Sequence, residues 1–235
     1  MAALQHPQLP LSFVPGDLFT FESYVAGINA VAAGLAQQSA LNTGEKQLYF
    51  WGDSGLGKSH LLQASCNLAA KNQQTVCYLT PTEIVNQSSE MFDGLEQIDL
   101  LCLDDIEVWL ADDDWQVALF NLINRVRESG NRLMMASAHP PEEAFVKLPD
   151  LRSRLSWGPV FQLQNLSDKE KFQALKFRAN QNGLELPENV ADYIMQRYPR
   201  DMLGLFERLT MLDKASMVMQ RRLTIPLVKS VFAEE

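Results

Sequence analysis

The sequence predicts an α/β fold in which a five-stranded, mainly parallel sheet is followed by a small all-α lid. Up to about residue 165, short apolar runs alternate with amphipathic stretches, which is typical of consecutive βαβ units. Beyond that residue the strand signals stop and only helical patterns follow. We therefore expect an extended tail over residues 1–16, an α/β subdomain over 17–165 and a helical lid over 166–235.

Each strand is expected where a short apolar run is bounded by turn residues or by a helical pattern. Apolar residues at helical spacing follow between the runs, and the lid opens on the capping-box pair Ser167 and Glu170. The expected strands cover residues 48–51, 75–79, 100–103, 132–136 and 160–163. The expected helices run from the end of the Gly-rich loop to about 71, over 115–128, over 168–182, from 187, over 201–219 and over 225–232.

The composition fits an ordinary globular protein. The 235 residues, of which 46% are hydrophobic, suffice for one large domain or for one domain with an appended lid. No run of about 18 apolar residues is present, and the first residues lack the pattern of a secretory signal. Cys66, Cys77 and Cys102 lack the spacing of a disulfide framework or a zinc site. We therefore expect a cytoplasmic protein with no membrane partner.

The charge balance bears on nucleic-acid binding. The chain has 20 basic and 29 acidic residues and a formal net charge of −9, with no long Lys/Arg cluster. A protein that binds duplex DNA by itself normally presents a basic face to the phosphates. The composition therefore disfavours autonomous DNA binding.

Residues 52–59 match the complete phosphate-loop (P-loop) pattern G-x-x-x-x-G-K-[ST]. Glycines let backbone N–H groups surround the phosphates, the lysine brings positive charge, and the last hydroxyl can ligate Mg²⁺. The loop lies between a predicted strand and a predicted helix, whose N-terminal end favours anions. The sequence therefore predicts a site for a nucleoside phosphate with Mg²⁺. The residues expected to bind it are Gly52, Ser54, Gly55, Leu56, Gly57, Lys58 and Ser59.

A second motif follows the third strand, which ends at Asp104 and Asp105. A carboxylate at the end of an apolar strand can hold Mg²⁺ through its water shell, and the next one can position or deprotonate an attacking water. With a P-loop earlier in the chain, the pair indicates a Walker B element, with Asp104 on the metal side and Asp105 on the water side. The run of three aspartates at 112–114 is expected to begin a helix instead.

Together these motifs resemble the AAA+ domain of the bacterial replication initiator DnaA. Two further stretches carry the resemblance, DLFTFESYVAGIN over residues 17–29 and LRSRLSWG over 151–158, and it extends from about residue 17 to the last residue. The expected fold is therefore an AAA+ P-loop NTPase core with a helical lid, and the expected ligand is ADP or ATP. The layout, without the initiator's N-terminal region or helix-turn-helix domain, resembles the Hda family of DnaA-related regulators. A short form that loads or assists other replication factors is the alternative.

The resemblance implies roles for four further residues, and position alone adds a fifth. Arg154 aligns with the arginine finger that reaches the γ-phosphate of a neighbouring molecule, and Arg200 aligns with the lid arginine that senses the nucleotide in cis. Tyr24 and Val25 fall where the family lines the base pocket. His60 directly follows Ser59, so its position alone is expected to bring it near the phosphates. Without the resemblance, the favoured explanation for Arg154 is an exposed surface arginine or a helix-end cation. The alternatives are a helix-start ion pair for Arg200 and simple core packing for Tyr24 and Val25. The base preference stays open, because a P-loop reads phosphates.

The tail carries a short motif of its own. Residues 8–13 read QLPLSF and match the sliding-clamp-binding pattern Q-L-x-L-x-F. Glutamine supplies an amide for hydrogen bonds, and the apolar side chains can fill a pocket from an extended backbone. The expected clamp-binding residues are Gln8, Leu9, Leu11 and Phe13.

One position departs from the family. Ala138 stands where the initiator has an aspartate after the serine of its sensor strand, and His139 next to it is expected to be a solvated loop residue. The missing polar group predicts weak hydrolysis by this chain. We therefore expect a nucleotide-bound regulator that docks on the sliding clamp and stimulates ATP hydrolysis by DnaA through Arg154. The alternatives are a self-contained ATPase that forms a homo-oligomer and a DNA-binding adaptor.

Overall fold

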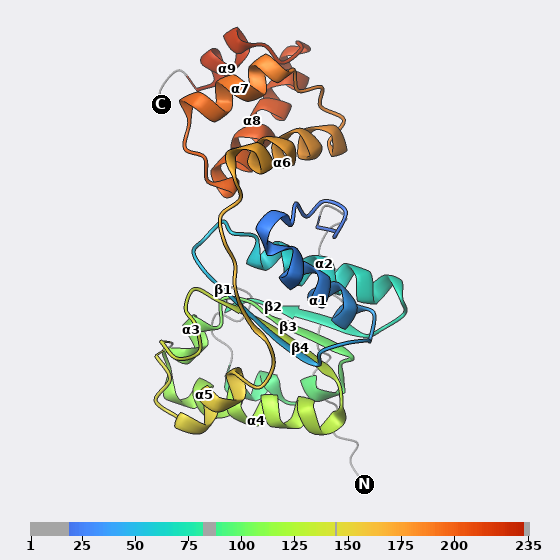
Figure 1. Ribbon diagram of the computed structural model, residues 1–235, viewed down its shortest axis with the longest axis vertical. Coiled ribbons are helices and arrows are strands. Elements are labelled where there is room, and N and C mark those ends of the chain that lie inside the picture. The colour runs from blue at the N-terminus through green and yellow to red at the C-terminus, as the bar shows by residue number, and fades with distance from the viewer. Residues whose placement is uncertain (1–18, 82–87, 144, 233–235) are drawn as a thin grey trace.

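The computed structural model describes residues 19–81, 88–143 and 145–232. Its centre is a five-stranded sheet in the order β2-β3-β4-β1-β5, and every neighbouring pair of strands is parallel (Figure 1). This confirms the expected sheet. The strands are β1 (Gln47–Trp51), β2 (Val76–Leu79), β3 (Leu100–Leu103), β4 (Arg132–Ser137) and β5 (Val160–Gln162).

Helices cover both faces of the sheet, so the central strands are buried on each side, as in other parallel sheets. In β1, Leu48 and Phe50 pack into the apolar cluster on one face, whereas Tyr49 packs into the cluster on the other. The helices of the first face are η1 (Gly27–Asn29), α1 (Ala30–Ala40) and α2 (Lys58–Lys71). Those of the second face are η3 (Ser89–Phe92), η4 (Leu95–Gln97), α3 (Glu107–Leu110), α4 (Asp113–Ser129) and α5 (Pro149–Leu155).

The helix starts follow the expected side-chain caps. The Asp112 side chain accepts hydrogen bonds from the backbone N–H groups of Asp114 and Trp115, so the aspartate run does begin a helix, α4. Ser167 and Glu170 form the reciprocal capping box that begins α6. In contrast, the sequence pattern does not predict α1, α3 or α5.

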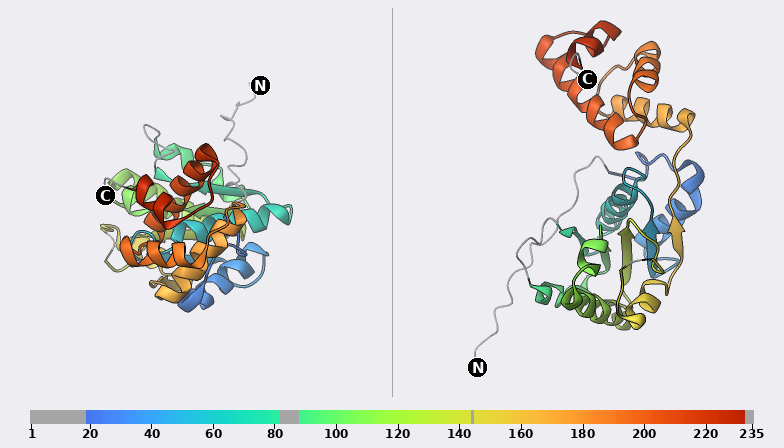
Figure 2. Two further views of the ribbon diagram at one scale, coloured as in Figure 1. Left: turned by 90° about the horizontal axis from the view of Figure 1, so that it is seen from above. Right: turned by 90° about the vertical axis from the view of Figure 1, so that its left-hand side faces the viewer.

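The last four helices gather into an apolar cluster of their own. Figures 1 and 2 show this group beyond the layer of α1 and α2, on the side of the sheet away from α4. The helices are α6 (Asp168–Gln181), α7 (Glu188–Arg197), α8 (Met202–Met219) and α9 (Ile225–Val231). Among the described residues, no helix is long and apolar enough to cross a membrane.

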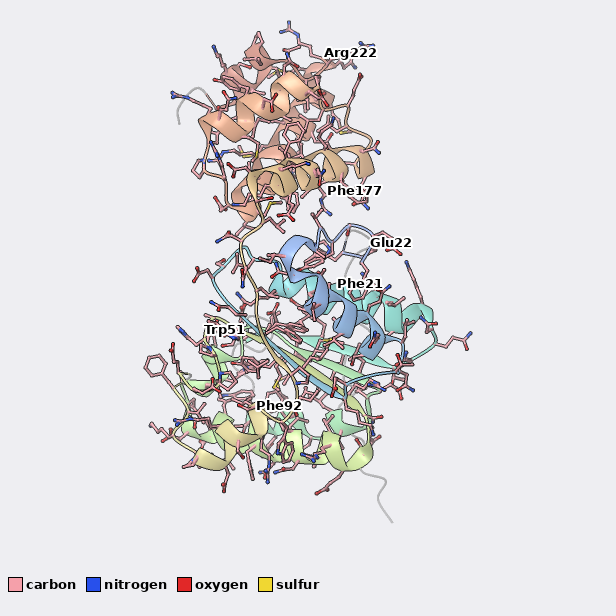
Figure 3. All side chains as sticks on the ribbon, viewed as in Figure 1. Phe21, Glu22, Trp51, Phe92, Phe177 and Arg222 are labelled. Carbon is pink, nitrogen blue, oxygen red and sulfur yellow. The ribbon has the colours of Figure 1, made fainter. Side chains whose placement is uncertain are left out.

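The segment before α1 packs against the lid. Figure 3 shows Phe21 and Glu22 on this segment, below the side of α6 that carries Phe177. The Arg178 guanidinium lies 5.6 Å from the centre of the Phe19 ring and 5.6 Å from that of Phe206 in α8. The lid therefore contacts the core next to the start of α2.

Candidate functional site

The P-loop follows the carboxyl end of β1 and leads into α2. Gly57, the residue before the first turn of α2, has φ +90°, and a Cβ built there would lie 3.0 Å from Cε2 of Tyr24. Gly52 has φ +141°, and its Cβ would meet the carbonyl oxygen of Leu163 at 3.0 Å. Both the backbone conformation and the close neighbours therefore require glycine at these two positions.

Lys58 is buried, and its ammonium group lies inside the loop. Its Nζ donates hydrogen bonds to the carbonyl oxygens of Gly52 (2.6 Å) and Asp53 (2.8 Å). A buried ammonium needs such partners, because desolvation would otherwise penalise its charge. The cation is thus held where an anion in the loop would meet it.

Asp104 lies at the carboxyl end of β3 and is almost completely buried, with 1% of its surface exposed. Its Oδ2 accepts a hydrogen bond from the Tyr78 hydroxyl (2.6 Å), and its Oδ1 accepts one from the backbone N–H of Asp105 (3.1 Å). Burial, followed by the charge of Asp104, raises the pKa of Tyr78 well above its ordinary value. Tyr78 is a functional candidate that sequence reasoning missed, because only the pairing of β2 with β3 brings it there.

Asp105 is exposed and takes the left-handed backbone conformation, with φ +50°. Loss of hydration, then the charges of Asp104 and Glu107, raises its pKa, while the charge of Lys58 acts in the opposite direction. The two aspartates and Lys58 therefore belong to one electrostatic cluster at the carboxyl edge of the sheet.

Ala138 follows β4 directly and lies beside the start of the P-loop. The register pairs Trp51 with Ser137, and the backbone N–H of Gly52 donates to the Ser137 carbonyl oxygen (3.3 Å). The adjacent His139 is exposed, and its ring packs against Phe145 with centroids 6.3 Å apart. The side chain beside the start of the P-loop is therefore the methyl group of Ala138, and the His139 ring packs against Phe145.

A pocket beside the loop is lined by core and lid residues. From the core it includes Tyr24, Val25, Gly55, Leu56, Gly57 and His60, all of which were expected at the ligand. It also includes Asn29, Met202 and Phe206, which sequence reasoning missed. The lid side chains have no local sequence signal, because docking of the lid decides which of them reach the pocket.

His60 fixes one wall of this pocket. Its Nε2 lies 3.1 Å from the Thr20 carbonyl oxygen and 3.1 Å from the Ser23 hydroxyl, and its ring meets those of Phe19 and Tyr24 edge to face, each at 5.2 Å. Burial, and then the charge of Arg178, lowers the pKa of His60 to about 4. His60 is therefore a neutral anchor between α2 and the segment before α1.

Arg200 is not brought to this pocket. Its guanidinium pairs with the Asp168 carboxylate, and its Nε donates to the Met195 carbonyl oxygen (2.7 Å). These contacts lie within the lid, on a surface between α6 and α7. The structure thus has the helix-start ion pair that is the simpler explanation for this residue.

Arg154 lies at the opposite edge of the sheet. Its carbonyl oxygen accepts a hydrogen bond from Gln47 (2.7 Å), the first residue of β1, whereas the P-loop follows the last. The two ends of β1 are about 13 Å apart, because a strand rises by about 3.3 Å per residue. The half-buried Arg154 guanidinium lies 3.9 Å over the Trp157 ring, and its Nε donates to the Asn124 side chain (2.9 Å).

The residues at the P-loop edge fit Mg²⁺ as well as a phosphate chain. Among the described residues, no group of three or more His, Cys, Asp or Glu side chains could hold a metal by itself. Mg²⁺ usually keeps several waters and takes one or two protein ligands plus phosphate oxygens. The Ser59 hydroxyl, in the first turn of α2, and the Asp104 carboxylate, after β3, match that donor set. Their chain neighbours Lys58 and Asp105 interact electrostatically, so the two ends lie near each other.

Comparison with known proteins gives two family matches. Residues 16–162 match the bacterial DnaA ATPase domain, and residues 168–232 match the lid domain of Hda. An uncharacterized protein of Haemophilus influenzae is 40% identical over 225 residues, which cover 95% of this chain and 97% of that protein.

Solved structures share the fold. Domain III of the Thermotoga maritima replication initiation protein DnaA aligns with a TM-score of 0.82 at 22% identity, covering 96% of this chain and 98% of that one. AMPPCP-bound DnaA from Aquifex aeolicus aligns with a TM-score of 0.73 at 24% identity, covering 87% and 67% of the two chains. At these identities the alignments establish the fold alone.

Proposed function

The chain belongs to the DnaA-related AAA+ proteins with an Hda-type lid, and from that premise we propose that it is a nucleotide-bound regulator of replication initiation. In this proposal it docks on the DNA sliding clamp and stimulates ATP hydrolysis by DnaA, which inactivates the initiator.

The first part of the proposal is that the pocket holds ADP or ATP. The buried Lys58 ammonium, the glycine conformations of the loop and the pocket beside it support a nucleotide with its phosphates at Gly52–Ser59. The relative from Aquifex aeolicus was solved with AMPPCP, an adenine nucleotide analogue. Ser59 and Asp104 would hold Mg²⁺, which neutralises charge on the outer phosphates when bound.

The observation that carries the second part is the position of Arg154. The residue lies at the amino end of β1, whereas the chain's own P-loop lies at the carboxyl end. Its guanidinium is held by Trp157 and Asn124 and not by residues of the chain's own P-loop, so in this proposal it acts on the phosphates of a neighbouring molecule. An arginine supplied in trans stabilises the charge of the transition state and can accelerate phosphoryl transfer by about 10³–10⁵-fold.

The nucleotide of this chain then acts as a structural ligand. Ala138 puts a methyl group beside the P-loop where a polar side chain could orient the attacking water, which favours slow turnover here. A ligand that binds the folded form stabilises it by mass action. Bound ADP would therefore stabilise the arrangement of core and lid that presents Arg154.

The clamp contact is proposed for the tail motif. Gln8, Leu9, Leu11 and Phe13 lie outside the described residues, so this part rests on the sequence pattern. Replacement of Gln8 and Phe13 by alanine should abolish clamp binding while the affinity for ADP is unchanged. Clamp binding by the double variant would contradict the motif assignment.

The main test is ATP turnover by DnaA with the clamp loaded on DNA. The unmodified chain should stimulate turnover, Arg154→Ala should not, and Arg222→Ala, an exposed arginine at the far end of the lid, should stimulate normally (Figure 3). Absence of stimulation by the unmodified chain would contradict the proposal.

The second candidate is a self-contained ATPase or a DnaA-like loader or accessory factor, acting as a homo-oligomer. The exposed Asp105 carboxylate at the P-loop edge favours it, because such a group can deprotonate water. Rapid hydrolysis by the isolated chain, lost in Asp105→Asn, would support this candidate over the first.

A further inference from the structure

The Tyr24 hydroxyl is a buried polar group without a hydrogen-bond partner among the described residues. Most buried polar side-chain atoms in proteins have a partner, because an unsatisfied group keeps the full cost of its desolvation. An exception therefore calls for an explanation. A ligand that supplies the partner is one such explanation when the group lies at a binding pocket.

The Tyr24 hydroxyl lies beside the loop that is expected to bind the phosphates of the ligand. A Cβ built on Gly57 would lie 3.6 Å from Oη of Tyr24 and 3.0 Å from Cε2, so this edge of the ring lies against the P-loop. Tyr24 also lines the pocket, together with Gly55, Leu56 and Gly57. The backbone of a P-loop at this point surrounds the phosphate chain of its ligand.

The ring is held in this position from behind. His60 meets it edge to face, with centroids 5.2 Å apart, and His60 is itself fixed by Thr20 and Ser23. Burial raises the pKa of Tyr24 to about 12, so the phenol keeps its proton at neutral pH. The hydroxyl is therefore a fixed donor beside a loop whose other donors are backbone N–H groups and an ammonium.

We propose that the Tyr24 hydroxyl donates a hydrogen bond to a phosphate oxygen of the bound nucleotide. The family resemblance predicts only that Tyr24 lines the base pocket, whereas its closeness to Gly57 shows that its hydroxyl lies beside the P-loop. The inference rests on the proposed nucleotide binding and assigns one side chain of that site to the phosphate chain.

The proposal predicts opposite effects of one substitution in the two states. Tyr24→Phe removes the unsatisfied hydroxyl and keeps the ring, so the ligand-free protein should be at least as stable. We expect its Tm to rise by about 2 °C. In the bound state the same change removes a charge-assisted hydrogen bond, and the Kd for ADP should rise about tenfold. A residue with a purely structural role would not produce this pair of effects.

The experiment compares the unmodified chain, Tyr24→Phe and Tyr193→Phe, a tyrosine in α7 that does not line the pocket. Affinity is measured for ADP and, by competition, for adenosine. The Kd ratio of Tyr24→Phe to the unmodified chain should be about ten for ADP and about one for adenosine, and Tyr193→Phe should give one for both. A ratio near one for ADP, equal ratios for the two ligands, or a lowered Tm of ligand-free Tyr24→Phe would overturn the inference.

These outcomes are separable from failure of the proposed function. If the unmodified chain does not bind ADP, the nucleotide site itself is wrong. If it binds ADP and Tyr24→Phe binds equally well, only the role of the hydroxyl is wrong. If the chain fails to stimulate DnaA or to bind the clamp, the ADP affinities of the unmodified chain and of Tyr24→Phe still test the role of the hydroxyl.

Discussion

The guanidinium of Arg154 lies 3.9 Å from the centre of the Trp157 ring, and that of Arg127 lies 3.8 Å from the same centre. Two cations on one indole are held by the negative faces of its π system, and such contacts gain strength when partly desolvated. Nε of Arg154 also donates a hydrogen bond to Oδ1 of Asn124. The Arg154 side chain thus has a defined conformation in this chain, and if it acts as the proposed arginine finger, this lowers the entropy lost on binding a partner.

Trp157→Ala should therefore weaken stimulation of DnaA without affecting the chain's own nucleotide. We expect stimulation to fall about tenfold, because an arginine without its support spends less time in the active geometry. Trp157→Phe retains a weaker cation–π partner, so its stimulation of DnaA should lie between that of the unmodified chain and that of Trp157→Ala. The assay is DnaA turnover with loaded clamp, with ADP affinity as the control. Full stimulation by Trp157→Ala would show that the indole does not position Arg154.

Lys58→Ala should remove most of the affinity for nucleotide. Its ammonium lies inside the loop, and we expect the Kd for ADP to rise about a hundredfold on loss of this charge. Lys71→Ala removes an exposed cation from the other end of α2 and is the matched control. Titration calorimetry measures both. If the two variants bind ADP equally well, residues 52–59 do not bind its phosphates.

The stability of the protein should fall in acid partly because of His60. Its pKa is lowered to about 4 in the folded protein from an ordinary value of 6.5, so the unfolded chain binds the proton more tightly. This contribution to stability is complete above about pH 6.5 and is lost as the pH falls toward 4, by up to about 3 kcal/mol. His60→Gln should flatten the decline in unfolding free energy between pH 7 and pH 5, whereas His139→Gln, at an exposed position, should not. If the unfolding free energy falls equally steeply with pH in the unmodified chain and both variants, His60 does not cause the decline.

The parts of the fold found from sequence are those with strong local signals. The apolar run 100–103 predicts β3 at its observed bounds, and Ser167 with Glu170 predicts the start of α6. In contrast, α1 has a face of small alanines and little amphipathic contrast, and α5 is only 7 residues long. Neither offers enough periodicity to stand out.

The site divides in the same way. The P-loop and Asp104 belong to contiguous motifs that directly follow strands, so the sequence suffices to predict where they lie in the fold. The pairing of Asp104 with Tyr78 and the entry of Phe206 into the pocket depend on sheet order and lid docking. Arg200 shows the reverse case, in which a position implied by resemblance pairs with Asp168 inside the lid.

Asn29→Ala should loosen the junction between the core and the lid. Both ends of the buried Asn29 amide bond to the backbone of Gln164, with its Nδ2 donating to the carbonyl oxygen (2.9 Å) and its Oδ1 accepting from the N–H (2.8 Å). Alanine would leave two backbone groups of the connection to the lid without these partners, which costs about 1–3 kcal/mol each when they stay buried.

We therefore expect the unfolding free energy of Asn29→Ala to fall by about 2 kcal/mol. The amide N–H of Gln164 should also exchange with solvent faster than in the unmodified chain, because local opening needs less free energy when a protecting bond is lost. Asn72→Ala removes an exposed amide whose Nδ2 donates to the Leu68 carbonyl oxygen, and it should change neither quantity measurably. ADP should slow exchange at Gln164 in the unmodified chain, because the pocket is lined by Gln164 and by Met202 of the lid. If exchange at Gln164 is equally fast with and without ADP, the nucleotide does not stabilise the junction, and its role in presenting Arg154 fails with it.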